Sequence, residues 1–293
     1  MSSNDTILRF LFDKTDIRGE ITLLEKSYQE AISHQDIPAP LKQLLGEFLA
    51  ATVLVSQTLK FDGILTVQAR GKGPVSLIMA DVSNRGEVRC ILQQNPEHES
   101  INDYNDLSLP DLIGKGALSI IIEPEKGERY QGIVPLEHDT LAECLCHYFV
   151  QSEQLPTRMW LFSDGKKCGG LFLQCLPAQV IQDHEQRNEQ WQTATQLAAT
   201  IKQDELFELN LEDCLYRLFN EFECRVFPEK TLKFRCKCSE EKTLDAVYSL
   251  GEQDARQLIA EQDVINVDCQ FCGRKYIVSE TMIDQIFTRK SIH

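Results

Sequence analysis

Short apolar runs alternate with turn sequences through the first 177 residues, and this pattern predicts strands joined in hairpins. The expected strands are residues 7–12, 20–24, 64–69, 75–80, 87–93, two within 117–134, 158–162 and 170–175. Three helices are expected. The first passes through Tyr28 and Ala31, and the third runs from Asp139 or Thr140 to Phe149. The second begins at Pro38 and Pro40, and its apolar face consists of Leu41, Leu44, Leu45, Phe48 and Leu49. The predicted fold class is α+β, an antiparallel hairpin-rich domain over residues 1–177 with helices that cover one side.

After Pro177 the chain becomes polar and acidic, yet apolar residues still recur at helical spacing. The two apolar faces are Trp191, Ala194, Leu197, Ala198 and Ile201, followed by Leu211, Cys214, Leu215, Leu218, Phe219 and Phe222, with Asn210 as the expected cap of the second helix. We interpret residues 178–230 as an amphipathic helical linker whose apolar face docks on the first domain. The alternative is a face that is hidden in one state and offered to partners in another.

The last sixth of the chain contains two close pairs of cysteines, Cys236-Lys-Cys238 and Cys269-Gln-Phe-Cys272. Two chelating pairs can supply the four thiolates that Zn²⁺ binds tetrahedrally at about 2.3 Å. The second pair precedes Gly273 and resembles a zinc knuckle, whose tight turn requires a backbone conformation that glycine permits. The separation between the pairs is longer than in a common zinc ribbon, so it indicates a metal site without fixing the type of module.

The terminal module, residues 231–293, is small enough that a hydrophobic core alone would leave it marginally stable. A structural zinc site contributes on the order of 10 to 16 kcal/mol, so loss of the metal is expected to unfold the module. Oxidation is one route to that loss, because a sulfur in a disulfide no longer binds zinc as a thiolate. A disulfide between Cys236 and Cys238 would close a very small ring, and we expect it to be strained and easily reduced.

Basic residues surround the four cysteines, although the chain as a whole is acidic. These are Lys233, Arg235, Lys237, Arg274 and Lys275. Positive charge beside the pairs would offset the double negative charge of a zinc ion with four thiolates and favour the thiolate form. The alternative explanation is ordinary solubility.

Charge and composition narrow the possible partners and the compartment. A formal net charge of −15 and a pI near 4.9 disfavour nucleic acid and anionic membranes, because an acidic chain gains nothing from release of counterions at phosphates. The polar start at residues 1–5 has no apolar signal core, and no run approaches the length of a membrane span. A cytoplasmic, reducing location is expected, where the eleven cysteines would be thiols or metal ligands.

A second CxC sequence, Cys144-Leu-Cys146, lies in a predicted helix. Residues two apart on a helix point about 200° away from one another, so these two sulfurs are not expected to chelate one ion. One of them is interpreted as a core residue, and the role of the other stays open. The remaining single cysteines are expected in packing or on the surface; they are Cys90, Cys168, Cys175, Cys214 and Cys224.

Several longer motifs extend over nearly the whole chain. They are Phe10-Leu-Phe-Asp13 with Arg18-Gly-Glu20, Thr58-Leu-Lys-Phe-Asp-Gly63, Tyr130-Gln-Gly-Ile-Val-Pro-Leu136, Gln151-Ser-Glu-Gln-Leu-Pro-Thr157 and the two terminal cysteine pairs. In this order they resemble the bacterial redox-regulated heat-shock holdase chaperone (33 kDa chaperonin) family.

The resemblance implies an ATP-independent chaperone, not an enzyme, that is reduced, inactive and monomeric in the resting cell. One Zn²⁺ per chain would be bound by Cys236, Cys238, Cys269 and Cys272. Oxidants such as hypochlorite, or peroxide with heat, would form the disulfides Cys236–Cys238 and Cys269–Cys272, release zinc, and unfold the terminal module and the linker.

The activated form in this family is a homodimer that holds unfolding client proteins and prevents their aggregation under oxidative and heat stress. For this chain we expect the client-binding face to be Trp191, Leu197, Leu211, Leu215, Leu218 and Phe222. Cys146 and Cys168 depart from the family pattern, which leaves open whether only four thiols are redox-active.

Three other functions compete with this interpretation. A zinc-ribbon nucleic-acid-binding protein would use the basic residues beside the cysteines, but the overall charge disfavours it. A thiol oxidoreductase would use the CxxC pair for disulfide exchange. A zinc hydrolase is disfavoured because four thiolates leave no coordination position for water.

Overall fold

The computed structural model describes residues 5–59, 61–98, 103–105 and 107–290. It divides into two compact units, Met1–Phe234 and Arg235–His293. Lys60 of the Thr58–Gly63 motif and the start of the chain before Asp5 lie outside the described residues. The division into parts 1–177, 178–230 and 231–293 stays a prediction. None of the helices that the structure describes combines the length and apolar character that a bilayer crossing needs.

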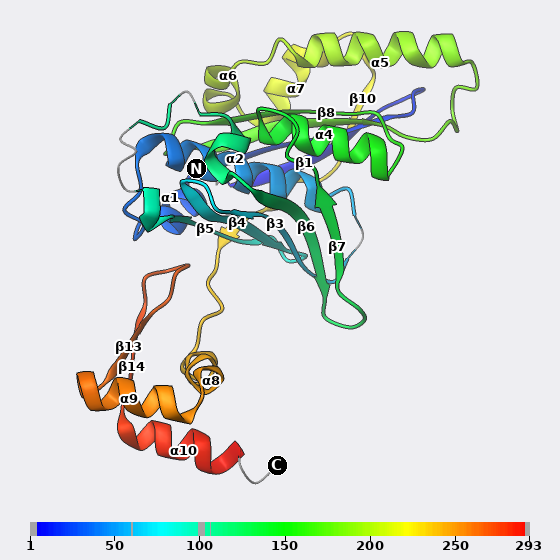
Figure 1. The fold of residues 1–293 in the computed structure, drawn as a ribbon. Helices are drawn as coiled ribbons and strands as arrows, with labels where there is room; N and C mark the ends of the chain where they lie inside the picture. The colour runs from blue at the N-terminus through cyan, green and yellow to red at the C-terminus, as the bar shows by residue number, and fades with distance from the viewer. Residues whose placement is uncertain (1–4, 60, 99–102, 106, 291–293) are drawn as a thin grey trace. The chain divides into compact units, whose positions relative to one another are not determined.

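The first unit is built from two sheets, which confirms the hairpin-rich α+β fold class (Figure 1). One sheet has the order β10 (Cys224–Val226), β1 (Thr6–Phe12), β2 (Ile17–Leu24), β9 (Cys168–Cys175) and β8 (Thr157–Ser163), and β11 (Lys230–Thr231) also pairs with β1. The other has the order β12 (Lys233–Phe234), β5 (Glu87–Gln94), β4 (Val75–Ser83), β3 (Gly63–Gly71), β6 (Gly116–Pro124) and β7 (Tyr130–Val134). Neighbouring strands are antiparallel except for β12 and β5, which are parallel.

Helix α2 (Ala39–Ser56) lies between the two sheets and contacts strands of both (Figure 1). The prediction that the helices cover one side of the domain is therefore wrong for this helix. The reason is its composition: beyond its first turn α2 is apolar almost all round, and such a helix is buried on every side. The other helices of this part are α1 (Lys26–Ile32), α3 (Leu109–Ile113) and α4 (Leu141–Ser152), with a short 3₁₀ turn at Pro96–His98. Thr140, not Asp139, caps α4.

Three helices of the predicted linker pack on the opposite face of the β1–β2–β9–β8 sheet. They are α5 (His184–Ala198), α6 (Gln203–Glu208) and α7 (Leu211–Phe219), and Asn210 caps α7 as expected. Their apolar faces meet Leu8, Phe10, Phe12, Ile17, Ile21, Leu23, Leu171 and Leu173 in a second hydrophobic core. The apolar face predicted for the linker is thus docked in this structure.

Asp16, in the turn between β1 and β2, holds the beginning of this segment. Its carboxylate accepts hydrogen bonds from the backbone N–H groups of Gln179, Val180 and Ile181 at 3.1, 2.9 and 3.2 Å. Arg187 adds an ion pair, with 3.4 Å between its Nε and an Asp16 oxygen. Burial raises the pKa of Asp16, but the three backbone donors and Arg187 outweigh this effect and hold the pKa below its ordinary value.

The second unit is small. It contains the hairpin β13 (Ile265–Asp268) and β14 (Lys275–Val278) and the helices α8 (Glu240–Leu250), α9 (Glu252–Gln262) and α10 (Glu280–Lys290). Among the residues whose burial is described, its buried apolar core consists of Val247, Ala255, Ile265, Val278 and Ile283. Such a small core leaves the unit dependent on another source of stability.

The Arg18-Gly-Glu20 motif lies in the middle of β2, and both of its last two residues are fixed by packing. Gly19 pairs with Phe10 of β1, and a Cβ atom added at Gly19 would lie 2.2 Å from the Phe10 ring. Glu20 is fully buried, and neither of its carboxylate oxygens has a hydrogen-bond partner among the described residues. Burial raises the pKa of Glu20 to about 7, although Arg18 and Arg9 act in the opposite direction.

We expect Glu20→Gln to raise the free energy of unfolding at pH 8 and to change it little at pH 5. Folded Glu20 keeps its proton up to about pH 7, whereas the unfolded side chain loses it near 4.5, so native stability falls as pH rises through this window. The difference between these two pKa values corresponds to about 3 kcal/mol. Urea unfolding at both pH values measures the effect, with Glu189→Gln on the exposed surface of α5 as the control. Equal stabilisation at both pH values would contradict the burial of an ionisable Glu20.

Candidate metal centre

The pair Cys269 and Cys272 lies in the turn between β13 and β14. The turn is held by backbone hydrogen bonds from Cys269 N–H to the Arg274 carbonyl at 2.9 Å and from Gly273 N–H to the Cys269 carbonyl at 2.8 Å. Gly273 has φ +66°, a left-handed conformation that favours glycine. The predicted need for glycine after this pair is therefore confirmed.

The pair Cys236 and Cys238 lies in the short segment that precedes α8. Ser239 ends this segment as the cap of α8, accepting a hydrogen bond from the Lys242 N–H at 3.3 Å. The ammonium group of Lys242 donates back to the Lys237 carbonyl at 3.0 Å. These contacts fix the backbone around the second thiol of the CxC sequence.

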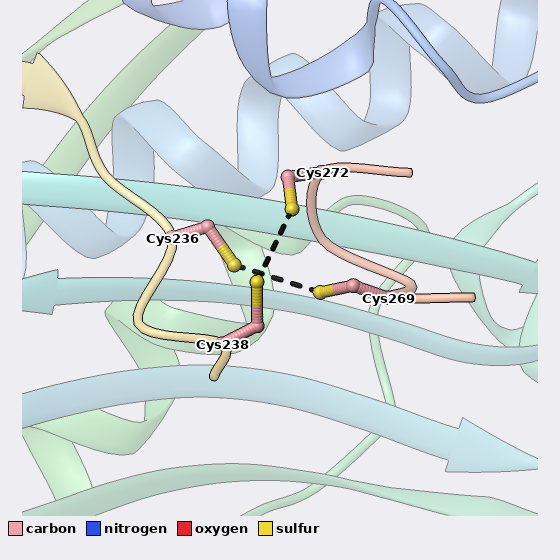
Figure 2. Close-up of side chains that lie close together, drawn as sticks. All are labelled: Cys236, Cys238, Cys269 and Cys272. Carbon is pink, nitrogen blue, oxygen red and sulfur yellow. Dashed lines mark hydrogen bonds between the residues drawn. The ribbon is translucent and has the colours of Figure 1, made fainter. Parts of the chain in front are cut away.

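The two pairs come together so that all four Sγ atoms lie within 4.8 Å of one another. Figure 2 shows the four sulfurs pointing into a common centre, and the Cys236–Cys269 and Cys238–Cys272 sulfur pairs are each 3.5 Å apart. A tetrahedral ion with metal–sulfur bonds of about 2.3 Å requires sulfur–sulfur distances of about 3.8 Å. The four thiols therefore fit a tetrahedral metal ion with little rearrangement.

Cys236 and Cys238 differ in acidity because their surroundings differ. Partial burial acts to raise the pKa of Cys238, but the Tyr276 hydroxyl, which donates to its sulfur at 3.1 Å, and the other three thiols lower it to about 7. For Cys236, burial is the main cause of a pKa raised to about 12. The surroundings of Cys238 therefore favour its thiolate form, and those of Cys236 favour the thiol.

Arg274 is a basic residue that acts on this cluster. Its pKa is raised by its hydrogen bond with Tyr276 and by the charges of Tyr276, Cys238 and Cys272. Tyr276 itself was not predicted from the sequence. Its position on β14, four residues after Cys272, is the signal that could have identified it, since the hairpin folds this strand back past the turn.

The residues predicted to bind clients all lie in or beside the core between α5–α7 and the sheet. Leu211, Leu215 and Leu218 are buried, with exposed fractions of 7%, 2% and 7%, whereas Trp191, Leu197 and Phe222 are partly buried at its margin. The Phe222 ring stacks on Phe12 with 4.5 Å between ring centroids. The structure brings all six residues to one interface.

The other seven cysteines are free thiols, as are the four of the cluster. Cys144 and Cys146 are both buried, with exposed fractions of 0% and 8%, so both belong to the packed interior. Cys168 is fully buried, and burial raises its pKa well above the ordinary value. A thiol in such surroundings reacts slowly with oxidants.

Comparison with known proteins agrees with this geometry. The family model for the Hsp33 protein matches residues 5–279. The 33 kDa chaperonin of Pseudomonas fluorescens strain Pf-5 is 44% identical over 98% of this chain and 95% of its own length. The 33 kDa chaperonin of Pseudomonas aeruginosa strain LESB58 is 45% identical over 98% of this chain and 96% of its own length.

A solved structure has the same fold. The crystal structure of the 33 kDa chaperonin (heat shock protein 33 homolog) of Thermotoga maritima gives a TM-score of 0.80, with 24% identity, over 99% of this chain and 100% of that chain. The family match, the two relatives and the cluster of four cysteines together lead to one conclusion: this chain belongs to the Hsp33 family of chaperones.

Proposed function

We propose that this protein is a redox-regulated, ATP-independent holdase chaperone that is inactive when reduced and zinc-bound and is activated by disulfide formation and zinc release. The observation that carries the proposal is the convergence of four thiols, whose Sγ atoms lie within 4.8 Å of one another, within a unit that has a very small hydrophobic core. A unit of this kind is stable while it holds a metal and unstable without it.

Cys236, Cys238, Cys269 and Cys272 would hold one Zn²⁺ as thiolates, and the bound ion would supply most of the stability of the second unit. The Tyr276 hydroxyl donates to the Cys238 sulfur, and Arg274 places positive charge beside it. Both contacts favour the thiolate over the thiol. The thiolate is the form that binds metal, and it is also the form that oxidants attack. The same surroundings therefore serve both states.

Activation requires oxidation of all four sulfurs. Each disulfide forms when two thiolates give up two electrons to one equivalent of an oxidant such as hypochlorite or peroxide, and the zinc ion leaves because its ligands are no longer thiolates. We propose the pairs Cys236–Cys238 and Cys269–Cys272. In a tetrahedral cluster every thiol is close to every other, but once the unit unfolds, partners near in sequence meet most often.

The surface that oxidation exposes for client binding is the apolar face of the linker. In the proposed active state α5–α7 leave the sheet, and Trp191, Leu197, Leu211, Leu215, Leu218 and Phe222 become available to unfolding clients. We also propose that the active form is a homodimer, that the resting form is a monomer, and that neither state acts on nucleic acid or membranes. The resting state requires a reducing compartment, which we take to be the cytoplasm.

Oxidation is expected to raise hydrogen exchange across residues 178–230 to near the unfolded rate. The docked helices lose protection if they leave the sheet, and the amides of Gln179, Val180 and Ile181 report on the Asp16 contacts in the same experiment. Exchange measured by mass spectrometry on the reduced zinc-loaded and the oxidised protein makes the comparison, with β3 and β4 of the other sheet as the internal control. Equal protection of residues 178–230 in both states would exclude the proposed client face.

A further inference from the structure

A second group of metal-binding side chains lines a cavity in the first unit. The cavity has a volume of about 500 Å³ and lies beside α4, with His138, Cys146 and His147 in its lining. His138 precedes the Thr140 cap of α4, Cys146 and His147 lie on the helix, and Arg158 and Met159 come from β8. The loop before the helix therefore returns His138 to the same side as His147.

The two imidazole rings contact one another at a tilt beside this cavity. Their centroids are 4.9 Å apart with an interplanar angle of 51°. The Nε2 atoms of both rings are buried and have no hydrogen-bond partner among the described residues. Buried polar atoms without partners are rare in proteins because each one has lost its hydrogen bonds to water. Two such nitrogens in one cavity indicate a ligand that both can contact.

Two sulfur atoms, from Cys146 and Met159, add to the two imidazole nitrogens as candidate ligand atoms. Cys146 and Met159 are almost fully buried, with exposed fractions of 8% and 6%, and both line the cavity. Cys144, two residues before Cys146, instead donates its thiol hydrogen to the His138 carbonyl at 3.5 Å, which fixes the loop. The cavity therefore offers two imidazoles, one thiol and one thioether.

We propose that this cavity binds one Cu(I) ion through the Nε2 atoms of His138 and His147 and the Sγ of Cys146, with Met159 as a weak fourth ligand. Imidazole, thiolate and thioether ligands together suit copper. Among the described residues, only the four terminal cysteines have three or more ligand atoms already within 4.8 Å of one another. Binding therefore involves rotation of the imidazole and thiol side chains into the cavity, which is large enough for this motion.

Charge favours a monovalent ion over a second zinc. Binding replaces the proton on Cys146 by the metal, and one thiolate neutralises Cu(I) completely. Arg158 adds a positive charge to the lining of the cavity. The lining also contains the Glu143 carboxylate, which accepts hydrogen bonds from the Thr140 N–H and hydroxyl at the start of α4. A divalent ion would leave net positive charge beside Arg158 in a partly buried site, which is unfavourable. This inference concerns the first unit and does not depend on the redox function proposed above.

The test is a competition titration of the full-length, reduced, zinc-loaded protein with Cu(I) buffered by bicinchoninate. A chromogenic zinc dye in parallel reports zinc released from the terminal cysteines. Wild-type protein is expected to hold one more Cu(I) equivalent than His147→Gln or Cys146→Ser. In each variant the affinity of the cavity for Cu(I) is expected to be at least tenfold lower than in wild type. His184→Gln, which alters an exposed histidine at the start of α5, is expected to match wild type.

A second measurement on wild-type protein covers the case in which a variant does not fold. In nitrogen-15 spectra of the imidazoles, the signals of His138 and His147 are expected to shift with Cu(I), while that of His184 stays in place. The proposal is overturned if wild type and all variants bind the same number of copper equivalents, if copper uptake only replaces zinc, or if the two imidazole signals do not move. Uptake of a second Zn²⁺ in preference to Cu(I) would overturn the assignment of the ion.

Discussion

Cys269→Ser is expected to unfold the second unit of the reduced protein while the first unit stays folded. The serine hydroxyl is not an anionic sulfur ligand, so the variant loses one of four zinc ligands and much of the metal affinity. A structural zinc site is worth on the order of 10 to 16 kcal/mol, whereas the second unit has a very small buried apolar core. The core cannot replace stabilisation of that size.

Zinc content and hydrogen exchange of residues 235–268 and 274–290 measure this effect, together with suppression of client aggregation before and after oxidant. The variant is expected to bind less than one zinc per chain and to respond to oxidant only weakly. Cys224→Ser is a suitable control because Cys224 is also half-buried but lies in β10, outside the cluster. Full zinc occupancy and a normal redox response in Cys269→Ser would refute the ligand assignment.

Phe219→Ala is expected to make the reduced protein active without oxidant. Phe219 is 1% exposed; its ring packs edge-on against Phe12 with 4.8 Å between centroids, and lies at a tilt to Phe10 with 5.8 Å between centroids. Truncating a buried phenylalanine costs about 3 to 5 kcal/mol. That loss falls on the interface that holds α7 on the sheet, so the linker face becomes exposed while the four cysteines keep their metal.

Aggregation suppression by the reduced, zinc-loaded variant measures this prediction, and zinc content shows that the metal centre is intact. Tyr216→Ala is the matched control, because Tyr216 lies on the same helix but is 74% exposed. Hydrogen exchange over residues 178–230 establishes whether the linker has left the sheet. A variant whose linker is exposed but which suppresses no more aggregation than Tyr216→Ala would show that this face does not bind clients.

The sequence predicted most of the strands because apolar runs alternate with turn sequences, as at Lys72–Pro74 between β3 and β4. It did not predict the position of α2. The spacing of apolar residues identifies one apolar face of the helix. Whether the helix is buried between two sheets depends on which elements pack against its other faces. The strands β10, β11 and β12 were also missed, because two or three residues carry no periodicity and are strands only through their partners.

At the metal centre, the sequence predicted the convergence of the two cysteine pairs and the role of Gly273, since spacing and turn chemistry are local properties. It did not predict Tyr276 as a donor to Cys238, nor the opposite pKa shifts of Cys236 and Cys238. Both depend on which groups the hairpin brings next to each sulfur. Nor did the sequence predict that Arg274 acts on the cluster through its hydrogen bond with Tyr276 and through the charges of Cys238 and Cys272.

The strands β10, β11 and β12 protect two sheet edges from other chains. β10 and β11 pair along β1, and β12 pairs along β5, so the backbone N–H and C=O groups at these places are already bonded. In the sequence, all three strands come after α7 and before Cys236, the first cysteine of the cluster. A chain cut after residue 223 would expose both edges, and open edges add strands from neighbouring molecules. Such a truncation is expected to self-associate into β-sheet aggregates even with the rest of the first unit folded.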